Sequence, residues 1–479
     1  MSAKKILLIN PPATLSKGIN ESTMYPPIGL GYLSSYLKKY ATINQYHVRI
    51  IDANALGLGL EAVLKEASAF RPDVVGIHMN VILAASGIQI AKAIKAAHDA
   101  MVCIGGPLTS SNPEEMLALS GADIAFVGES EQTFLEICEG RQPDKVAGVA
   151  YLKKGKFFRT EPRKLIEDLD AIPFPDYDIM PPLRKYESRA RRFPVGVIMS
   201  SRGCPYQCTF CNSSIFGKRY RARSPENVVD EIEMLVRKYG IGQLDVLDDN
   251  FTLDIERAGR ILDLIIERKL DILINLQNGV RADRLTWDIV MKMKRAGVFK
   301  AGVGIESADG DVLKSIRKSL DPDKVIRALA WFRKAGIITV GFFILGFPND
   351  SRESIERTIR FAIKSNPSIA NFCMLTPFPG TEMYESMKKS GLLKDESALV
   401  YQSGFYDANL YHRCPKLTEE ELRAFQRKAY LGFFFRPRKM VEMLLTIRSY
   451  RELKWTLGTI SPIAQSILKF IKIRRRPLH

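Results

Sequence analysis

Short apolar runs alternate with amphipathic segments along the first 140 residues. Five of these runs have the length and the β-branched content of buried parallel strands. They are residues 5–9, 47–51, 73–77, 101–104 and 123–127. Segments between them, such as 87–97, repeat apolar residues at the spacing of one helix face. Strands that alternate with helices predict an α/β domain over residues 1–140, with an open, doubly wound parallel sheet.

The same alternation returns in the second half of the chain, over residues 193–410. Six further apolar runs there are expected to be parallel strands: 195–200, 244–247, 272–275, 300–305, 338–344 and 370–375. Residues 141–192 connect the two domains, and two short strand patterns around Lys153-Lys-Gly155 predict a hairpin within them. Residues 411–479 are expected to be helical, with a helix start near Thr418.

Three cysteines stand close together after the first strand of the second domain. Cys204, Cys208 and Cys211 are spaced at i, i+4 and i+7. Gly203 and Pro205 flank the first of them and prevent a regular helix at this point, so the loop can wrap around one object. Three thiolates on one loop suit an iron–sulfur cluster in which one iron has no protein ligand.

The other four cysteines bear on the alternative interpretations. A structural zinc site normally has four ligands in two separated pairs, whereas Cys103, Cys138, Cys373 and Cys414 are scattered. Seven cysteines, an odd number, in a long chain whose N-terminus lacks the layout of a secretory signal do not favour a disulfide framework. Chance clustering would not explain the neighbouring Gly and Pro. An iron–sulfur cluster is therefore the favoured interpretation.

The spacing CxxxCxxC, with the aromatic Phe210 before the third cysteine, resembles the motif of the radical S-adenosylmethionine (radical SAM) enzymes. The resemblance implies a [4Fe–4S] cluster on Cys204, Cys208 and Cys211, whose open iron chelates SAM. It also implies reductive cleavage of SAM to a 5′-deoxyadenosyl radical, with electrons from a partner such as ferredoxin or flavodoxin. The expected fold of residues 193–410 is then a partial (βα)6 barrel related to the TIM barrel, with its chemistry at the carboxyl ends of the strands.

Polar residues gather where the predicted strands of this barrel end. Together with Phe210, the resemblance assigns to SAM binding Asp248, Asp249, Asn250, Glu306, Ser307 and Arg317. The three residues at 248–250 follow the second strand, where the family holds the amino group of SAM. Those at 306, 307 and 317 would contact its ribose and carboxylate, with the arginine offering a fork for the carboxylate. The alternative for each is an ordinary helix cap or surface ion pair.

The first domain resembles the cobalamin-binding, Rossmann-like domain that precedes many radical SAM domains. The resemblance rests on the loops at its strand ends and on Pro26-Pro-Ile-Gly-Leu-Gly-Tyr-Leu33. The cobalamin-binding candidates at these strand ends are Pro11, His78, Gly105, Gly106, Gly128, Glu129 and Ser130. The loop 10–25 has no histidine where cobalt-ligating members carry Asp-x-His-x-x-Gly. We therefore expect cobalamin without a histidine from this loop on cobalt; the alternative is that cobalamin binding has been lost.

The positive charge of the chain is concentrated at its C-terminus. Residues 423–479 hold fourteen Lys and Arg against Glu442 and Glu452, a net of +12 out of +17. Basic residues mixed with Phe, Trp and Leu are typical of a helix on an anionic membrane surface. Nucleic-acid binding and a solvated helical coat are the alternatives. No apolar run is long enough for a membrane span, so we expect a cytoplasmic protein, peripheral on the inner face of the membrane.

These observations together predict a cobalamin-dependent radical SAM enzyme. Methylation of an unactivated carbon in a lipid-like or isoprenoid, or other apolar, small molecule is the favoured reaction. The alternative within this class is ring closure, ring rearrangement or C–C coupling without methyl transfer. A methylthiotransferase-like enzyme that modifies RNA would carry more cysteines in the first domain and a C-terminal β-barrel, so nucleic acid is not the expected partner. A non-catalytic cobalamin sensor would not need the intact cysteine loop.

Overall fold

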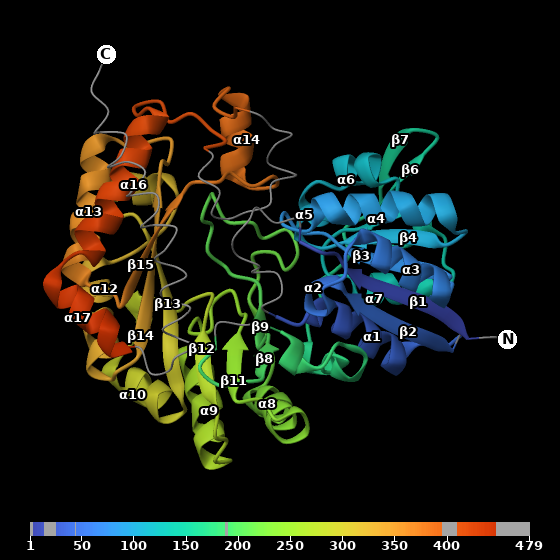
Figure 1. Cartoon of the computed structure of the whole chain (residues 1–479), viewed down its shortest axis with the longest axis horizontal. Helices are drawn as coiled ribbons and strands as arrows, with labels where there is room; N and C mark the ends of the chain where they lie inside the picture. Colours follow the sequence, from blue (N-terminus) through green and yellow to red (C-terminus); the bar gives the residue numbers. More distant parts are fainter. Residues whose placement is uncertain (1–2, 14–24, 44, 187–189, 395–409, 447–479) are drawn as a thin grey trace.

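The computed structural model describes residues 3–13, 25–43, 45–186, 190–394 and 410–446. Within these ranges the chain forms two α/β domains that lie side by side, each built on its own sheet (Figure 1). The α/β class and the two-sheet organisation expected from the hydrophobic pattern are therefore confirmed.

The first sheet has seven strands in the order β2-β1-β3-β4-β5-β6-β7. They are β1 (Lys4–Asn10), β2 (Tyr46–Asp52), β3 (Val74–His78), β4 (Met101–Gly105), β5 (Ile124–Phe126), β6 (Val149–Lys153) and β7 (Lys156–Arg159). Strands β1 to β5 are parallel, as predicted. The chain turns first to β2 on one side of β1 and then to β3 on the other. The crevice for a ligand in such a sheet lies at this reversal, outside the carboxyl ends of β1 and β3.

Helices cover both faces of the first sheet. They are α1 (Ile28–Tyr40), α2 (Ala53–Leu56), α3 (Leu60–Phe70), α4 (Ala84–Ala97), α5 (Pro107–Ser111), α6 (Pro113–Ser120) and α7 (Glu131–Cys138). The central strand shows the effect of this cover: Ile6, Leu7, Leu8 and Ile9 are fully buried, on both faces of the strand. A strand buried on both faces reads as a continuous apolar run in the sequence.

The predicted hairpin in the connector is confirmed as β6 and β7. It does more than bridge the domains, because β6 pairs antiparallel with β5 and so extends the first sheet. The sequence pattern shows a hairpin but contains no signal for the strand with which it pairs.

The second sheet has six parallel strands in the order β15-β14-β13-β12-β11-β8. They are β8 (Val195–Ile198), β11 (Gln243–Val246), β12 (Leu273–Leu276), β13 (Val298–Glu306), β14 (Ile338–Leu345) and β15 (Ile369–Met374). Consecutive strands are neighbours throughout. This is the arrangement of the expected partial barrel, in which all strands end at the same edge.

The helices of the second domain alternate with its strands along the sequence. They are α8 (Pro225–Tyr239), α9 (Ile255–Glu267), α10 (Trp287–Arg295), α11 (Gly310–Ser315), α12 (Pro322–Lys334), α13 (Arg352–Ser365) and α14 (Glu382–Lys389). Burial alternates along β14, where Phe343 and Leu345 are buried and Phe342 and Ile344 are partly exposed. The buried Phe343 stacks on Phe372 of β15, on the side of the sheet that faces the helices. The partly exposed residues therefore line the inner face of the sheet.

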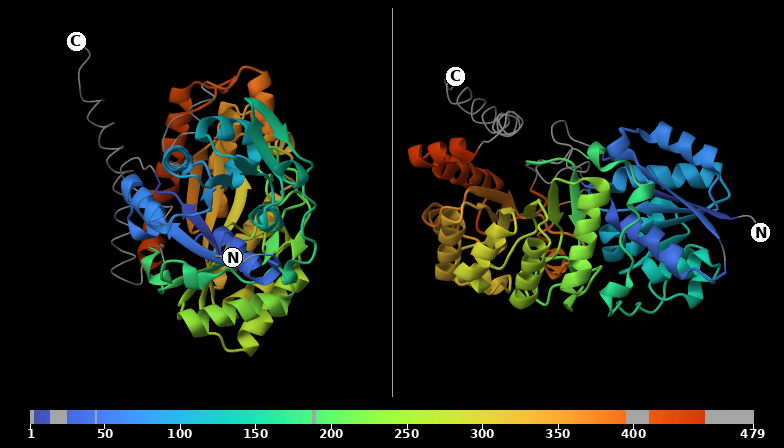
Figure 2. Two further views of the ribbon diagram at one scale, coloured as in Figure 1. Left: turned by 90° about the vertical axis from the view of Figure 1, so that its right-hand side faces the viewer. Right: turned by 90° about the horizontal axis from the view of Figure 1, so that it is seen from below.

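Two C-terminal helices, α16 (Glu419–Phe434) and α17 (Pro437–Thr446), follow the barrel. The predicted start of α16 is confirmed, since Thr418 and Glu421 form a reciprocal capping box. Helix α16 packs against β15 and α13, and Figure 2 shows both C-terminal helices at the end of the molecule opposite the first domain. None of the helices in the described ranges combines the length and apolarity needed to cross a bilayer.

Candidate active site

The cysteine loop leaves the barrel through a small two-stranded sheet. After β8, Ser201–Arg202 forms β9 and pairs antiparallel with β10 (Arg221–Ala222). Gly203 then turns the chain with a φ of 81°, and a Cβ at this position would lie 2.2 Å from the carbonyl oxygen of Arg219. Only glycine fits such a close approach of two backbone segments. Gly203 therefore fixes the point at which the loop starts.

The three cysteines of the loop are free thiols that influence one another. Burial, followed by the neighbouring Cys208, Asp249 and Cys204, raises the pKa of Cys211 to about 11. Three mutually interacting thiols fit a [4Fe–4S] cluster, which neutralises thiolates by binding each to its own iron. No three His, Cys, Asp or Glu side chains in the described ranges converge on a single ion, and a cluster held by one thiolate per iron does not require this.

Phe210 connects the cysteine loop to the far strands of the barrel. Its ring lies 5.8 Å from that of Phe347, just beyond β14. The neighbouring Thr209 donates its N–H to Ile316 O and accepts the N–H of Met383 through its own carbonyl. The loop is thus held across the carboxyl ends of β13, β14 and β15, where the family resemblance predicts SAM.

Of the SAM candidates after β11, Asp248 and Asp249 both bond to the start of the cysteine loop. Asp248 is buried and accepts hydrogen bonds from Ser200 and Ser201 at 2.5–2.6 Å. Asp249 accepts the N–H of Gly203 at 3.1 Å, and burial raises the pKa of its carboxyl group. Gly203 contacts only one oxygen of Asp249, whereas Ser200 and Ser201 engage both oxygens of Asp248, so Asp249 is the better placed of the two to meet an amino group.

The fourth-strand candidates occupy the same edge of the barrel but have protein partners. Glu306 pairs with Lys318 at 2.6 Å, and Ser307 is within 3.2 Å of the Thr358 hydroxyl. Arg317 forms a two-pronged ion pair with Glu382, and both side chains are half exposed. For Arg317 to hold a SAM carboxylate it would have to exchange this exposed partner, which costs little. Asn250 accepts a hydrogen bond from Thr252. The SAM assignments of all these residues stay predictions.

A polar chain runs across the carboxyl ends of the first three strands of the first domain. His78 Nδ1 lies 3.2 Å from Asn10 Oδ1, and Asn10 in turn donates to Asp52 at 2.9 Å. Burial lowers the pKa of His78 to about 4, so its imidazole is neutral at pH 7. Pro11, next to this chain, accepts a hydrogen bond from Asn54 through its carbonyl. The structure thus places two of the cobalamin candidates at the crevice between β1 and β3.

The loop after β4 carries a buried hydroxyl that has no partner. Thr109 is fully buried, and no hydrogen bond reaches its Oγ1 within the described part of the chain. The loop begins at Gly105 and Gly106; the latter has a φ of 122°, and a Cβ there would come within 2.5 Å of the Met79 carbonyl oxygen. This close approach holds the loop after β4 against Met79 and His78, at the carboxyl end of β3.

The two candidate cofactor regions meet in space. Asn212, directly after the last cluster cysteine, donates to the Ser111 hydroxyl at 2.6 Å, and Ser111 donates to Ser214 at 3.1 Å. Ser111 ends the loop and short helix that follow β4 of the first domain. The loops at the strand ends of the two domains are therefore in direct contact, although they lie a hundred residues apart in the sequence.

A buried ion network joins the same two regions. Arg202 of β9 binds Glu129 at 3.1 Å and Glu131 at 2.6 Å, and Arg221 of β10 binds Glu129 at 2.8 Å. Ser130 donates to the carbonyl of Gly128 beside it. The carboxylate of Glu129, a cobalamin candidate, is thus engaged by two arginines and by the N–H of Ile166. Neither arginine was predicted, because nothing in the sequence pairs Arg202 or Arg221 with a glutamate that lies 73 or 92 residues away.

A polar cluster inside the barrel was not predicted from the sequence either. Tyr25 reaches in from the first domain and donates to Asp245 at 2.6 Å, and Asn275 donates to the same carboxylate at 2.8 Å. Burial raises the pKa of Asp245, and the carbonyl oxygen of the Asn275 side chain is buried with no hydrogen-bond partner among the described residues. Asp245 and Asn275 are opposite each other on β11 and β12. Two polar residues inside apolar strands were the available signal.

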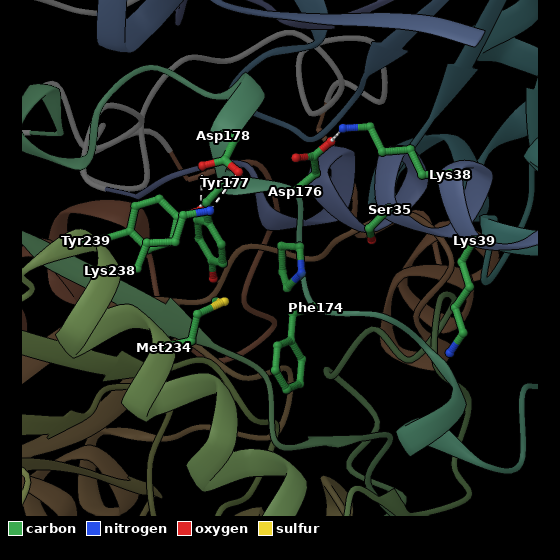
Figure 3. Close-up of a pocket in the computed structure, with 11 residues that line it drawn as sticks. Ser35, Lys38, Lys39, Phe174, Asp176, Tyr177, Asp178, Met234, Lys238 and Tyr239 are labelled. Carbon is green, nitrogen blue, oxygen red and sulfur yellow. Dashed lines mark hydrogen bonds and ion pairs between the residues drawn. The ribbon is translucent and has the colours of Figure 1, made fainter. Parts of the chain in front are cut away.

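The structure also has a separate cleft of 360 Å³, and none of the three cluster cysteines lines it. It is lined by α1, α8 and the connector around Phe174 (Figure 3). Its charged groups are already paired, with Lys38 bound to Asp176 and Lys238 bound to Asp178. The cleft is a seam between the two domains rather than part of the candidate active site.

Comparison with protein families matches both domains. Residues 198–362 match the model of the radical SAM superfamily, and residues 22–138 match the model of the B12-binding domain. The first match contains all three cluster cysteines, and the second contains the loops after β3, β4 and β5 but begins after the end of β1. Strands β1, β6, β7 and β15 and the C-terminal helices lie outside both matches.

Several curated proteins resemble the chain over most of its length. An uncharacterized methyltransferase of Pyrococcus horikoshii is 35% identical over 92% of this chain and 95% of its own length. The cytidylyl-2-hydroxyethylphosphonate methyltransferase of Streptomyces wedmorensis is 28% identical over 84% of this chain and 85% of its own. The anaerobic magnesium-protoporphyrin IX monomethyl ester cyclase of Rubrivivax gelatinosus is 29% identical over 80% of this chain and 70% of its own length.

Among solved structures, that of the cobalamin-dependent S-adenosylmethionine radical enzyme OxsB with aqua-cobalamin bound has a TM-score of 0.73 to this chain. The two chains are 17% identical, and the superposition covers 97% of this chain and 71% of the OxsB chain. At this identity the likeness concerns the fold. The close sequence relative and the two domain matches together show that the chain belongs to the B12-binding radical SAM family, whose cofactors are a [4Fe–4S] cluster, S-adenosylmethionine and cobalamin.

Proposed function

We propose that this cobalamin-dependent radical SAM enzyme methylates an unactivated carbon of a lipid-like or other apolar small molecule. The observation that carries the proposal is the contact of Ser111 with Asn212 and Ser214, which joins the loop after β4 to the cysteine loop. When bound, the cluster with SAM supplies a 5′-deoxyadenosyl radical and cobalamin supplies a methyl group. This contact brings the two candidate cofactor regions together, so that one substrate carbon would meet both reagents.

The chain's own residues orient the reagents and exclude water. Gly203, Asp249 and Asp248 fix the start of the cysteine loop on the strand ends of the barrel. Phe210 and Phe347 pack over its last turn, so that apolar side chains surround the radical's origin. Exclusion of water and of other hydrogen donors protects a reactive intermediate from side reactions.

The inner face of the barrel sheet supports an apolar substrate with a polar end. Val340, Phe342 and Ile344 of β14 are partly exposed on that face. The polar cluster around Asp245 and Asn275 lies on the same sheet, on the neighbouring strands β11 and β12, and both side chains are buried. An amphipathic substrate would place its hydrocarbon along β14 and direct its polar end towards these strands.

Ring closure or coupling without methyl transfer is the second candidate. It is favoured by the Rubrivivax gelatinosus relative, which is named as a cyclase and is 29% identical to this chain. The described residues after the barrel form two helices and no β-barrel, so an RNA-modifying enzyme of the methylthiotransferase kind has no support there.

Product mass tests the proposal. The anaerobically reconstituted enzyme, with cluster, cobalamin and a strong reductant, is incubated with lipid extracts and SAM that carries a trideuterated methyl group. We expect a product heavier than its substrate by about 17 Da, which is one CD3 in place of one hydrogen. The Cys208→Ala variant is the control and should yield no product. A product lighter by about 2 Da and free of deuterium would contradict methyl transfer and indicate ring closure or coupling.

A further inference from the structure

Helix α17 turns its apolar residues outward. On this helix Met440 is 49% exposed, Val441 56%, Leu444 66% and Leu445 76%. These four residues stand at i, i+1, i+4 and i+5, so they form one stripe along the helix. Phe435, at the end of α16 and 61% exposed, lies beside the start of the stripe in the sequence. We call these five residues the α17 stripe.

The opposite face of α17 carries cations that point into the protein. Lys439 is 2% exposed, donates to the carbonyl of Pro367 at 2.6 Å and lies 5.0 Å from the centre of the Phe433 ring. Arg436, just before the helix, donates to the Ile363 carbonyl and to Asn366. The helix is therefore held to the barrel by its polar residues. A helix whose outer face met only water would turn its apolar residues towards the protein and its charged residues towards the solvent.

Most charges around the stripe are positive, and Glu442 of α17 is paired with Arg438 and Lys439. The sequence continues beyond α17 with residues 447–479, which hold eight Lys and Arg and one acidic residue, Glu452. This segment lies outside the described residues, so its predicted membrane helix is untested, and only its charge bears on what binds the stripe. A second copy of the chain seated on the stripe would bring two such cationic segments together, which is unfavourable. An anionic lipid surface satisfies both the apolar residues and the charge.

We propose that the α17 stripe inserts into the surface of an anionic membrane and attaches the enzyme there. Helix α17 lies at the end of the molecule opposite the first domain (Figure 2), so attachment through this helix leaves the loops that join the two domains away from the membrane. The proposal concerns attachment and stands whichever substrate is methylated.

Vesicle flotation with the full-length protein tests it. Leu444→Ser together with Leu445→Ser removes the two most exposed leucines of the stripe without changing charge. The matched control, Ile43→Ser with Leu56→Ser, removes two exposed apolar side chains, 68% and 44% exposed, from the first domain. The vesicles contain 30 mol% phosphatidylglycerol in phosphatidylcholine. We expect the wild type and the control to float, and the stripe variant to bind at least about tenfold more weakly, since each inserted leucine contributes 1 kcal/mol or more.

The other occupants of the stripe give different results. Equal binding of the stripe variant and the wild type would overturn the proposal. So would a wild type that binds RNA but no vesicles, because the basic segment would then serve a nucleic acid. A wild-type dimer that the stripe variant converts to a monomer, with no vesicle binding, would assign the stripe to a second copy. A marked loss of thermal stability in the stripe variant, again without vesicle binding, would show that residues 447–479 cover it.

Discussion

Arg202 of the barrel domain and Glu129 of the cobalamin-binding domain form a buried ion pair, with Arg202 Nη1 3.1 Å from Glu129 Oε1. The arginine stands two residues before the first cluster cysteine. The glutamate stands three residues after β5, in a loop at the ligand-binding edge of the first sheet. The pair, extended by Arg221 and Glu131, fixes how the cysteine loop faces the strand ends of the other domain.

Replacing Glu129 by Gln should destabilise the protein strongly. The change leaves Arg202 and Arg221 buried with only Glu131 to balance them, and breaking a buried ion pair in this way typically costs about 3–5 kcal/mol. Urea unfolding monitored by circular dichroism should show a lower midpoint. The exposed Glu114→Gln on α6 serves as the control and should unfold like the wild type. An unchanged midpoint for the Glu129 variant would show that the network does not hold the domains together.

Replacing any one of Cys204, Cys208 and Cys211 by Ala should remove the cluster and SAM cleavage. Each thiolate binds one iron, and a cluster with two protein ligands is not retained. Iron and sulfide content, the absorbance of the cluster and the formation of 5′-deoxyadenosine report the result. Cys103, Cys138 and Cys414 are buried and do not belong to the cysteine loop, so their Ala variants should keep all three signals. A triple cluster variant with full iron content and cleavage would refute the assignment.

Cobalamin in this protein should have no histidine nitrogen on cobalt. The loop 10–25 contains no histidine, and His78 directs Nδ1 to Asn10. The electron paramagnetic resonance spectrum of the Co(II) form should therefore lack nitrogen hyperfine splitting from the protein. The His78→Gln variant should give the same spectrum as the wild type. Splitting that disappears in this variant, or no binding at saturating cobalamin, would contradict the prediction.

Which strands exist and which domain they build could be predicted from the sequence, because strands buried on both faces appear as apolar runs. Ile6 to Ile9 and the β14 segment show this directly. The cysteine loop could be found because its chemistry depends on local spacing. Gly203, beside the first cysteine, allows the backbone to approach the carbonyl oxygen of Arg219, which is only sixteen residues away. The contact that requires this glycine is therefore also local in the sequence.

Long-range polar pairs could not be predicted in the same way. Arg202 and Glu129 are far apart in the sequence, and a lone arginine on a two-residue strand has no local pattern that names its partner. The same holds for Tyr25 and Asp245, which belong to different domains. Arg317 shows the converse case: a forked cation after a strand end suggested a carboxylate ligand, and the structure places Glu382 within its reach.

When the pH is lowered, the free energy of unfolding of the apo protein should decrease more steeply with His78 present than without it. Its folded pKa, about 4, is below its ordinary value of 6.5, so the unfolded chain takes up a proton that the folded chain refuses. The stability contributed by the neutral imidazole is therefore complete above pH 6.5 and is lost as the pH falls towards 4. At pH 5 the loss is about 2 kcal/mol.

Urea midpoints at pH 7 and pH 5 measure this effect. The shift between the two pH values should be smaller in His78→Gln than in the wild type by an amount equivalent to about 2 kcal/mol. Between pH 7 and pH 8 both proteins carry an uncharged side chain at this position, so their midpoints should change in parallel, which is the internal control. Identical shifts down to pH 5 would show that His78 takes up its proton equally in both states.

The hairpin of β6 and β7 also has a consequence for expression and solubility. A parallel sheet that stopped at β5 would present an open edge, and unpaired edges invite strand exchange between copies. Here the edge is closed by an antiparallel pair whose outer strand runs from Lys156 to Arg159, next to Lys153 and Lys154. Charged side chains along an outermost strand oppose pairing with a like strand. A fragment that ends before residue 149 would lose this protection, so the separately produced first domain should aggregate unless it extends beyond Arg159.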